Sequence, residues 1–411
     1  MLSEQTRAYP RSPAAPALAA VVKALEPIEF GSLVVTYGNG EWLVKGTRPG
    51  PSAVLRVNHP ARLLGQVFLS GGIGFAESYM RGDWDSPDLV DILHVLALNL
   101  PVLSAQTRSA VPVNWLHRLR HVLNRNSVRG SRRNIQAHYD RGNDFYRLWL
   151  DPTMTYSSAL FEGRECDLQE AQRRKYARLL ALLGARPGQR VLEIGCGWGG
   201  FALEAARRGI SVTGITLSRE QLSLARRRVR EAGLSGLVEL RLQDYRSLAC
   251  SYDHIVSIEM FEAVGEANWD TYTRTLKRCL KQGGRAALQF ITIDETAFES
   301  YRRRPDFIQR YIFPGGMLPS IERFGASVAS SGLCMQRADA FGEDYARTLA
   351  EWHRRFLASE GEIAAMGFDR VFRRMWRYYL AYCEAGFRAG RIDLAQVLLT
   401  NGPNGIGNST G

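Results

Sequence analysis

The chain has 411 residues, of which 45% are hydrophobic and 23% are charged, and its formal net charge is +12. The apolar fraction is too high for a disordered or collagen-like protein, and 39 Gly with 16 Pro is close to average usage. At about 100 to 200 residues per domain, the length predicts two or three domains with substantial cores. The positive charge alone admits nucleic acid, a membrane surface or another acidic partner.

Several kinds of segment are missing from the sequence. No stretch approaches the roughly 20 uninterrupted apolar residues of a membrane-spanning helix, and the best candidate, residues 90–105, is interrupted by Asp91, His94, Asn99 and Pro101. The first residues lack a basic segment followed by an apolar run, so we expect no export signal. The six cysteines show no zinc-binding spacing, and we expect reduced thiols and no metal.

Residues 1–106 predict a small α+β domain. Two β-rich runs at 31–46 flank Gly38-Asn39-Gly40 and indicate a hairpin, and residues 52–57 predict a further strand. Helical sequence follows at 75–84 and 86–100.

A basic connector, residues 107–134, comes next. Seven arginines and no acidic residue occur between Arg108 and Arg133, and apolar residues such as Trp115 and Leu119 recur at helical spacing. The pattern predicts a basic amphipathic helix. The apolar side of this helix can pack on a domain, and the helix pattern considered by itself favours this interpretation. It can also contact anionic lipid head groups, where each nearby cation contributes about 1 kcal/mol. No aromatic stacking motif or DNA-reading helix supports nucleic acid.

From residue 135 to about 400 the sequence alternates between short β-branched runs and helical stretches. This alternation predicts an α/β fold with a parallel, doubly wound sheet. The expected strands lie at 190–195, 211–217, 237–243, 252–259 and 283–293. The Gly- and Asn-rich tail, 401–411, is expected to be flexible.

The strongest motif is VLEIGCGWGG, residues 191–200, in which a hydrophobic strand runs into a glycine-rich turn and a helix. Gly195, Gly197 and Gly199 let the backbone approach a ligand closely, and the helix start presents free N–H groups. We therefore expect a nucleotide-like ligand. Gly200 completes a GxGxxG pattern, so a nicotinamide-dependent dehydrogenase is the first alternative.

The end of the second strand argues against a dehydrogenase. Glu220 has about the spacing of a ribose-binding acid, but Ser218 and Gln221 form a predicted capping box that places Glu220 inside the next helix. Glu193 precedes the glycine turn instead, and a polar pair at 243–244 ends the third strand. This order resembles the Rossmann-like methyltransferases that use S-adenosylmethionine.

Further segments narrow the resemblance. The chain resembles the cyclopropane-fatty-acyl-phospholipid synthase family, which includes the mycolic acid cyclopropane synthases, over most of 135–398. Residues 75–85 resemble the N-terminal domain of the phospholipid enzymes. The segments that carry the main match are HYDRGNDFYRLWLDPTMTYSSALF (138–161), GITLSREQ (214–221), SIEMFEAVG (257–265), RYIFPGGMLPS (310–320) and FGEDYARTLAEWHRRF (341–356).

This resemblance implies a reaction. The methyl group of S-adenosylmethionine would be transferred to a cis double bond of a phospholipid acyl chain, leaving a carbocation. In the family a bound bicarbonate is thought to remove a proton, which closes a cyclopropane ring. The alternative is a fatty-acid C-methyltransferase whose product is a methyl- or methylene-branched chain without a ring.

The resemblance also implies the site residues. The cofactor would be bound by Tyr139, Tyr156, Ser157, Glu193, Gly195, Gly197, Gly199, Thr216, Leu217, Gln221, Gln243 and Asp244. The bicarbonate pocket would be formed by Ser158, Glu262, Gln289, Ile291 and Tyr345.

Four positions depart from the family pattern. Ser158 replaces a Cys, a mild change if the main-chain N–H binds the anion, whereas Gln289 replaces a His and can neither carry a positive charge nor transfer a proton. Ala263 replaces a second His, and Glu384 replaces a small residue. We hypothesise that Glu384 reaches the pocket and assists or replaces bicarbonate, which would favour a branched product. The alternative is an ion pair with one of the nearby arginines Arg373, Arg374, Arg377 and Arg388.

The connector and the resemblance together change the interpretation of the charge. An enzyme whose relatives modify acyl chains within phospholipids gains from reversible attraction to an anionic surface. We expect a cytoplasmic protein, peripheral on the inner face of the cytoplasmic membrane, whose partners are phospholipid and an unsaturated acyl chain. We expect no nucleic-acid partner, since the polar-Pro-Pro-aromatic loop of nucleic-acid methyltransferases is missing, and a homodimer remains open.

Overall fold

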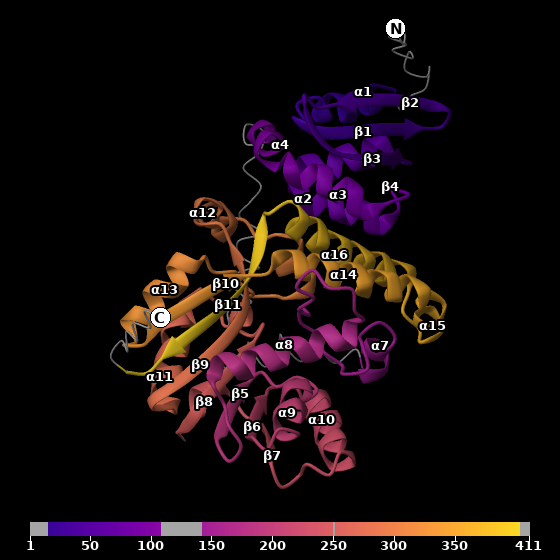
Figure 1. Cartoon of the computed structure of the whole chain (residues 1–411). Coiled ribbons are helices and arrows are strands. Elements are labelled where there is room, and N and C mark those ends of the chain that lie inside the picture. Colours follow the sequence, from indigo (N-terminus) through magenta and orange to yellow (C-terminus); the bar gives the residue numbers. More distant parts are fainter. Residues whose placement is uncertain (1–14, 108–141, 250, 403–411) are drawn as a thin grey trace. The chain divides into compact units, whose positions relative to one another are not determined.

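The computed structural model describes residues 15–107, 142–249 and 251–402 (Figure 1). The described chain forms two compact units. The first unit contains residues 15–107, Pro305–Ile308 and Trp352–Arg391, and the second contains the remaining described residues.

The first unit is built on a four-stranded sheet with the order β2-β1-β3-β4. The predicted hairpin is confirmed: β1 and β2 pair antiparallel, and Gly38 adopts a φ of +55° at the turn between them. Residues Leu33 and Val35 of β1 are buried and alternate with partly exposed neighbours, as expected for a strand with one face on a core. The elements of this part are α1 (Ala15–Leu25), β1 (Phe30–Tyr37), β2 (Gly40–Lys45), β3 (Arg48–Val57), α2 (Pro60–Arg81), β4 (Trp84–Asp85), α3 (Leu89–Leu98) and α4 (Leu100–Thr107).

The C-terminal helix α16 (Arg370–Arg388) belongs to the first unit. It packs against α2 and α3, and the buried Arg374 donates to the carbonyl oxygens of Tyr79 and Trp84 and pairs with Asp85 at 3.0 Å. α14 (Gly342–Ala358) contributes its last residues to the same unit, together with α15 (Glu360–Ala365). The structure therefore divides the chain differently from the expected boundary between 1–106 and 135–400. Helical periodicity shows that α16 has an apolar face, but it does not show against which of the two units that face packs.

The second unit contains a seven-stranded sheet with the order β7-β6-β5-β8-β9-β11-β10. Neighbouring strands from β7 to β9 are parallel, and β11 is antiparallel to both β9 and β10. The five predicted strands are confirmed, and the chain changes its winding direction between β5 and β8. The strands are β5 (Arg190–Ile194), β6 (Ser211–Thr216), β7 (Val238–Leu242), β8 (Tyr252–Ile258), β9 (Leu280–Ile293), β10 (Cys334–Ala340) and β11 (Ile392–Thr400).

Helices cover both faces of this sheet. Successive β5 residues contribute to opposite cores, since Val191 packs with α8, α9 and α10 whereas Leu192 packs with α11 and α13. This two-sided burial makes the strands apolar runs, as in other parallel sheets. The helical elements of the unit, besides the start of α14, are α7 (Asn143–Arg147), α8 (Leu168–Leu183), α9 (Gly200–Ala206), α10 (Arg219–Glu231), α11 (Trp269–Cys279), α12 (Glu295–Arg303) and α13 (Ile321–Ser330), with short turns η1 (Tyr245–Ser247), η2 (Phe261–Ala263), η3 (Glu266–Asn268) and η4 (Ile308–Ile312), the last shared with the first unit.

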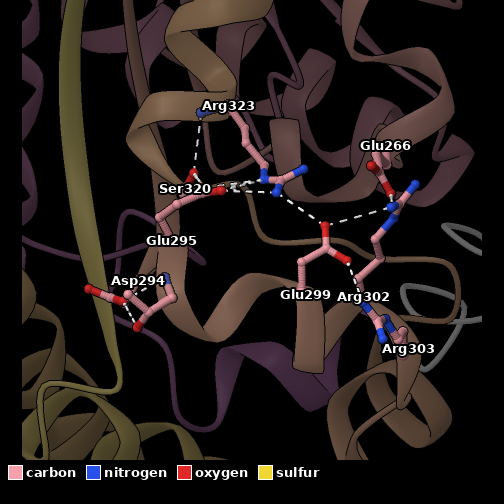
Figure 2. Close-up of polar contacts among 9 residues, drawn as sticks. Glu266, Asp294, Glu295, Glu299, Arg302, Arg303, Ser320 and Arg323 are labelled. Carbon is pink, nitrogen blue, oxygen red and sulfur yellow. Dashed lines mark hydrogen bonds and ion pairs between the residues drawn. The ribbon is translucent and has the colours of Figure 1, made fainter.

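An ion-pair network holds α12 to its neighbours (Figure 2). Arg323 at the start of α13 pairs with Glu295 at 2.9 Å and with Glu299 at 3.1 Å, while Arg302 pairs with Glu266 at 2.7 Å. The side chains are partly exposed, with exposed fractions between 28% and 47%, so each pair stabilises the fold little.

Two expected segments lie outside the described residues. These are the basic connector, except Thr107, and the tail, except its first two residues. Within the described ranges, no helix has the length and apolar character needed to cross a membrane. Five cysteines in the same ranges, Cys166, Cys196, Cys279, Cys334 and Cys383, are free thiols.

Candidate functional site

The glycine-rich turn lies at the carboxyl end of β5, beside the point where the winding direction changes. Gly195, Gly197 and Gly199 all have positive φ angles, between +49° and +88°. A Cβ at Gly195 would lie 2.9 Å from the Cγ atom of Met260, so a larger residue would not fit. In open α/β sheets this position is where ligands bind.

Glu193 is buried directly before this turn. Its Oε2 atom has no hydrogen-bond partner among the described residues, and burial raises the pKa of the carboxyl well above its ordinary value. An unpaired buried carboxyl costs free energy unless a cationic or hydrogen-bonding group reaches it. The amino group of a bound amino-acid-like ligand suits this position.

The ends of the next two strands lie at the same edge of the sheet. The Ser218 side chain caps α10 by accepting from the Gln221 N–H, which confirms the predicted N-cap. The reciprocal bond of the predicted capping box is replaced, because the Ser218 N–H donates to the Thr216 hydroxyl at 3.1 Å and that hydroxyl donates to the Oε1 atom of Gln221 at 3.0 Å. Leu217 between them is half-buried. At the end of β7 the Gln243 N–H donates to the Thr216 carbonyl oxygen.

Asp244 follows Gln243 and begins η1. Its side chain accepts from the Arg246 N–H, and its carboxylate pairs with the Arg246 guanidinium at 2.7 Å. The structure thus brings the predicted residues of β5, β6 and β7 to one edge of the sheet.

The segment before α8 carries three further predicted residues. Tyr139 lies outside the described residues, and the half-buried Tyr156 packs its ring against Trp149 and Phe313, at centroid distances of 5.4 and 6.5 Å. Ser157 is buried, and its side-chain oxygen accepts from Lys175 at 2.6 Å.

Lys175 was not predicted from the sequence. It lies on α8 with 0% of its surface exposed, and its ammonium also donates to Gln172 at 2.7 Å. Gln172 in turn donates to the carbonyl oxygen of Ser157 at 2.8 Å. Burial lowers the pKa of Lys175 to about 7, although Glu259, Asp151 and Glu193 oppose this shift. The two α8 side chains hold Ser157 at both its side chain and its main chain.

A carboxylate of the chain lies among the predicted bicarbonate ligands. The Oε1 atom of Glu259 accepts from the Ser158 N–H and from the Gln289 amide, each at 2.8 Å. Its Oε2 atom accepts from the Tyr345 hydroxyl at 2.5 Å. Three of the donors that the resemblance assigns to bicarbonate are therefore used by one side chain.

The backbone at Glu259 is strained. Its φ angle is +48°, a left-handed conformation that costs a non-glycine residue roughly 1 to 2 kcal/mol. Such conformations persist where the surroundings hold them, and they are frequent at functional sites. Here three hydrogen bonds to the carboxylate, together with the bond from the Glu259 N–H to the Gln289 carbonyl oxygen, hold it in place.

Glu262 forms the other acidic part of the pocket. Its Oε1 atom accepts from the Ile291 N–H at 2.6 Å, whereas its Oε2 atom has no hydrogen-bond partner among the described residues. Burial, followed by the nearby Glu259 charge, raises the pKa of Glu262 to about 8. Two neighbouring buried carboxyls do not ionise together easily, and the three donors to Glu259 favour its ionised form over that of Glu262.

The described residues do not fit a bound bicarbonate. Ser158, Gln289 and Tyr345 hold Glu259, and the Ile291 N–H holds Glu262. The site instead supplies a carboxylate of its own at the expected anion position.

Glu384 lies in the first unit, on α16. Its carboxylate is buried and 2.5 Å from the Arg388 guanidinium, as the alternative to our hypothesis expected. Burial raises the pKa of Glu384 to about 7, with opposing effects from Arg388 and supporting ones from Asp88 and Asp91. All of these partners belong to the first unit.

Sequence reasoning found Glu262 but missed Glu259, three residues earlier in the same motif. The signal was present, since Glu259 directly follows a buried parallel strand. Lys175 gave no such signal, because a lysine in a charged helix is normally exposed.

Comparison with known proteins identifies the family of the chain. The family model for mycolic acid cyclopropane synthetase matches residues 126–397. Tuberculostearic acid methyltransferase UfaA1 of Mycobacterium tuberculosis is 39% identical over 409 residues, which cover 96% of this chain and 94% of the relative. The cyclopropane-fatty-acyl-phospholipid synthase of Escherichia coli is 37% identical over 88% of this chain and 91% of its own length.

A solved structure supports the same assignment. The mycolic acid cyclopropane synthase CmaA1, complexed with SAH and CTAB, matches with a TM-score of 0.61 and 34% identity over 65% of this chain and 97% of the other. The fold is thus the Rossmann-like fold of the methyltransferases that use S-adenosylmethionine. The chain belongs to the mycolic acid cyclopropane synthetase family and is an S-adenosylmethionine-dependent methyltransferase.

Proposed function

We propose that this protein transfers the methyl group of S-adenosylmethionine to a cis double bond in a phospholipid acyl chain, and that Glu259 accepts the proton released afterwards. The observation that carries the proposal is the carboxylate of Glu259 at the anion position, held by Ser158, Gln289 and Tyr345. The family supports the methyl transfer, and the E. coli relative, by its name, acts on fatty acyl phospholipid.

The residues at the sheet edge would hold the methyl donor. Glu193 would bind its amino group, and the glycine turn would pass close to its main chain. Gln243 and Asp244 would contact the adenosine part. When bound, the cofactor supplies a methyl group on a positively charged sulfur, which an alkene can attack. The further cofactor residues of this proposal are Tyr139, Tyr156, Ser157, Thr216, Leu217 and Gln221.

The reaction conserves atoms and charge. One alkene carbon forms a bond to the methyl carbon as the methyl–sulfur bond breaks, and the other alkene carbon becomes a carbocation. Glu259 then accepts a proton from the new methyl group, and the electrons of that C–H bond close a three-membered ring. The negative charge of Glu259 also stabilises the carbocation in a water-poor site.

The surroundings suit Glu259 to this role. Three donors stabilise its ionised form, and the buried Lys175 favours it further, while burial alone raises its pKa. Glu262 retains its proton and does not compete. A carboxylate whose pKa is raised is a stronger base than an exposed one.

A branched product without a ring is the second candidate. It would form if a hydride moved between the two former alkene carbons before Glu259 took the methyl proton, which leaves a methylene group. Ala263 and Gln289 replace the two imidazoles of the family pattern, and the relative UfaA1 is by name a methyltransferase of tuberculostearic acid. A methyl branch would require a further reductase that supplies hydride.

The protein would work at the inner face of the cytoplasmic membrane. The net charge of +12 and the acid-free arginines of the connector support attraction to anionic phospholipid.

The test uses purified protein, methyl-deuterated S-adenosylmethionine and vesicles of an anionic phospholipid with cis-monounsaturated chains. We expect label in the acyl chains, and proton NMR of the released fatty acids to separate a ring CH₂ from an exocyclic methylene. Vesicles with saturated chains are the matched control. Label in added RNA, or in the head group alone, would contradict the proposal.

A further inference from the structure

A line of hydrogen bonds runs from Glu259 through two buried amides to an arginine of α8. Gln289 on β9 donates to Glu259 at 2.8 Å, and the Gln289 Oε1 atom accepts from Gln396 on β11 at 2.8 Å. The Gln396 Oε1 atom accepts from the Nε atom of Arg178 at 2.9 Å. Asp339 pairs with the Arg178 guanidinium at 2.8 Å.

The arginine sets the direction of every bond in this line. A glutamine side chain can turn either its oxygen or its NH₂ group toward a neighbour, whereas an arginine can only donate. Arg178 therefore requires the oxygen of Gln396, which leaves the Gln396 NH₂ for the oxygen of Gln289. Only the NH₂ group of Gln289 then remains to face Glu259.

Without this constraint the site has two arrangements. Both amides could rotate by half a turn with little change in shape, and Gln289 would then present its oxygen to the Glu259 carboxylate and to the Ser158 carbonyl oxygen, which now accepts from the Gln289 NH₂ group at 3.4 Å. Two acceptors facing each other repel, so Glu259 would take up a proton and could no longer receive one from the substrate. Gln289 and Gln396 are 1% and 2% exposed, so bulk water cannot easily compensate.

We propose that Arg178, acting through Gln396, is a positioning residue that fixes Gln289 as a hydrogen-bond donor to Glu259. This keeps Glu259 ionised and able to accept a proton. The inference rests on the proposed function, because it gives a role to the same carboxylate.

Other titratable groups also face Glu259. These are Lys175 of α8, Glu262 of η2 and the hydroxyl of Tyr345 on α14. The Arg178 and Gln289 variants leave all three groups in place. A change in the pH profile therefore reports on the hydrogen bonds that link Arg178 to Glu259 through the two amides.

The experiment is a double-mutant cycle between Arg178→Met and Gln289→Leu, measured as methyl transfer to unsaturated vesicles. We expect Arg178→Met to lower kcat about tenfold, the effect of one hydrogen bond to a charged group. The acidic limb of the kcat profile should move to higher pH, while KM for S-adenosylmethionine stays unchanged. In the Gln289→Leu background, Arg178→Met should have little further effect, because no amide remains to orient.

Two variants serve as controls. Arg178→Lys keeps a donor at this position and should retain most of the activity, whereas Arg173→Met removes an exposed arginine from the same helix and should change nothing. Thermal unfolding and cofactor binding show whether each variant is folded.

Two outcomes would overturn the inference. Arg178→Met could leave kcat and its pH profile unchanged, or it could lower kcat by the same factor in both backgrounds, which would mean that Arg178 acts through its charge or through the fold. A wild-type protein that transfers no methyl group to lipid would instead contradict the proposed function. The two failures are therefore distinguishable.

Discussion

Glu259 combines a strained backbone with a carboxylate that takes three hydrogen bonds. Because glycine adopts a φ of +48° without strain, Glu259→Gly should keep the fold while emptying the anion position. We expect kcat to fall by about a hundredfold, as for loss of a proton acceptor. Added bicarbonate or formate should restore part of the activity in a saturable way, because Ser158, Gln289 and Tyr345 regain a ligand.

Glu259→Gln is the matched control for this rescue. Its amide fills the space of the carboxylate, so added anions should restore nothing. Full activity of Glu259→Gly in the absence of any small anion would refute a role for this carboxylate in proton removal.

Lys175 should make stability depend on pH. Its pKa is about 7 in the fold and about 10.5 when the chain is unfolded, so the unfolded state binds more protons between these values. The free energy of unfolding should therefore rise with pH through this range, by up to about 1.4 kcal/mol per pH unit. Urea unfolding of Lys175→Met between pH 7 and 9 should lack this rise. An equal slope in both proteins would show that Lys175 is not the titrating group.

The candidate site shows which single residues could be predicted from the sequence and which could not. Motif resemblance located Glu262, Gln289, Ile291 and Tyr345, which the structure brings together. It could not locate Glu259, because a resemblance transfers roles only to positions that the family already uses. The amide line to Arg178 was equally hidden, since its members come from strands and helices far apart in the sequence.

At the scale of secondary structure, most elements could be predicted. The apolar runs of β5 to β9, the hairpin of β1 and β2 and the Ser218 cap all follow from local sequence, because periodicity and capping are local properties. The place of α16 could not be predicted in this way. The contacts of α16 with α2 and α3 depend on tertiary packing, and sequence periodicity carries no information about which elements pack together.

On α16, Glu384 should affect stability in the opposite sense to Lys175. Its pKa is raised from about 4.5 to about 7, so the folded state holds the extra proton between these values. Stability should therefore fall as pH rises from about 4.5 to 7, by on the order of 3 kcal/mol in total. Chemical unfolding of Glu384→Gln should show a smaller fall than the wild-type protein over that range. An equal or larger fall in the variant would contradict the assigned pKa shift.

At the scale of the whole molecule, the net charge of +12 predicts a salt-sensitive attraction to membranes. Sedimentation with anionic vesicles should recover the protein at low ionic strength and lose it near 1 M salt, where the screening length is about 3 Å. Replacing the seven arginines between 108 and 133 by glutamine should weaken this binding, and vesicles of zwitterionic lipid are the control. Equal recovery on both vesicle types would show that charge does not drive the association.

The composition of the first unit also bears on how the protein is made. Arg374 bonds to Tyr79, Trp84 and Asp85 across 289 to 295 residues of chain. During synthesis at about 5 to 20 residues per second, the ribosome needs about 15 to 60 s to travel from the first of these residues to the last. The N-terminal segment therefore leaves the ribosome long before α16, and the apolar face that α16 covers stays exposed during that time. We infer that a chain whose synthesis ends before residue 370 exposes its N-terminal segment to chaperones and proteases more than its other parts.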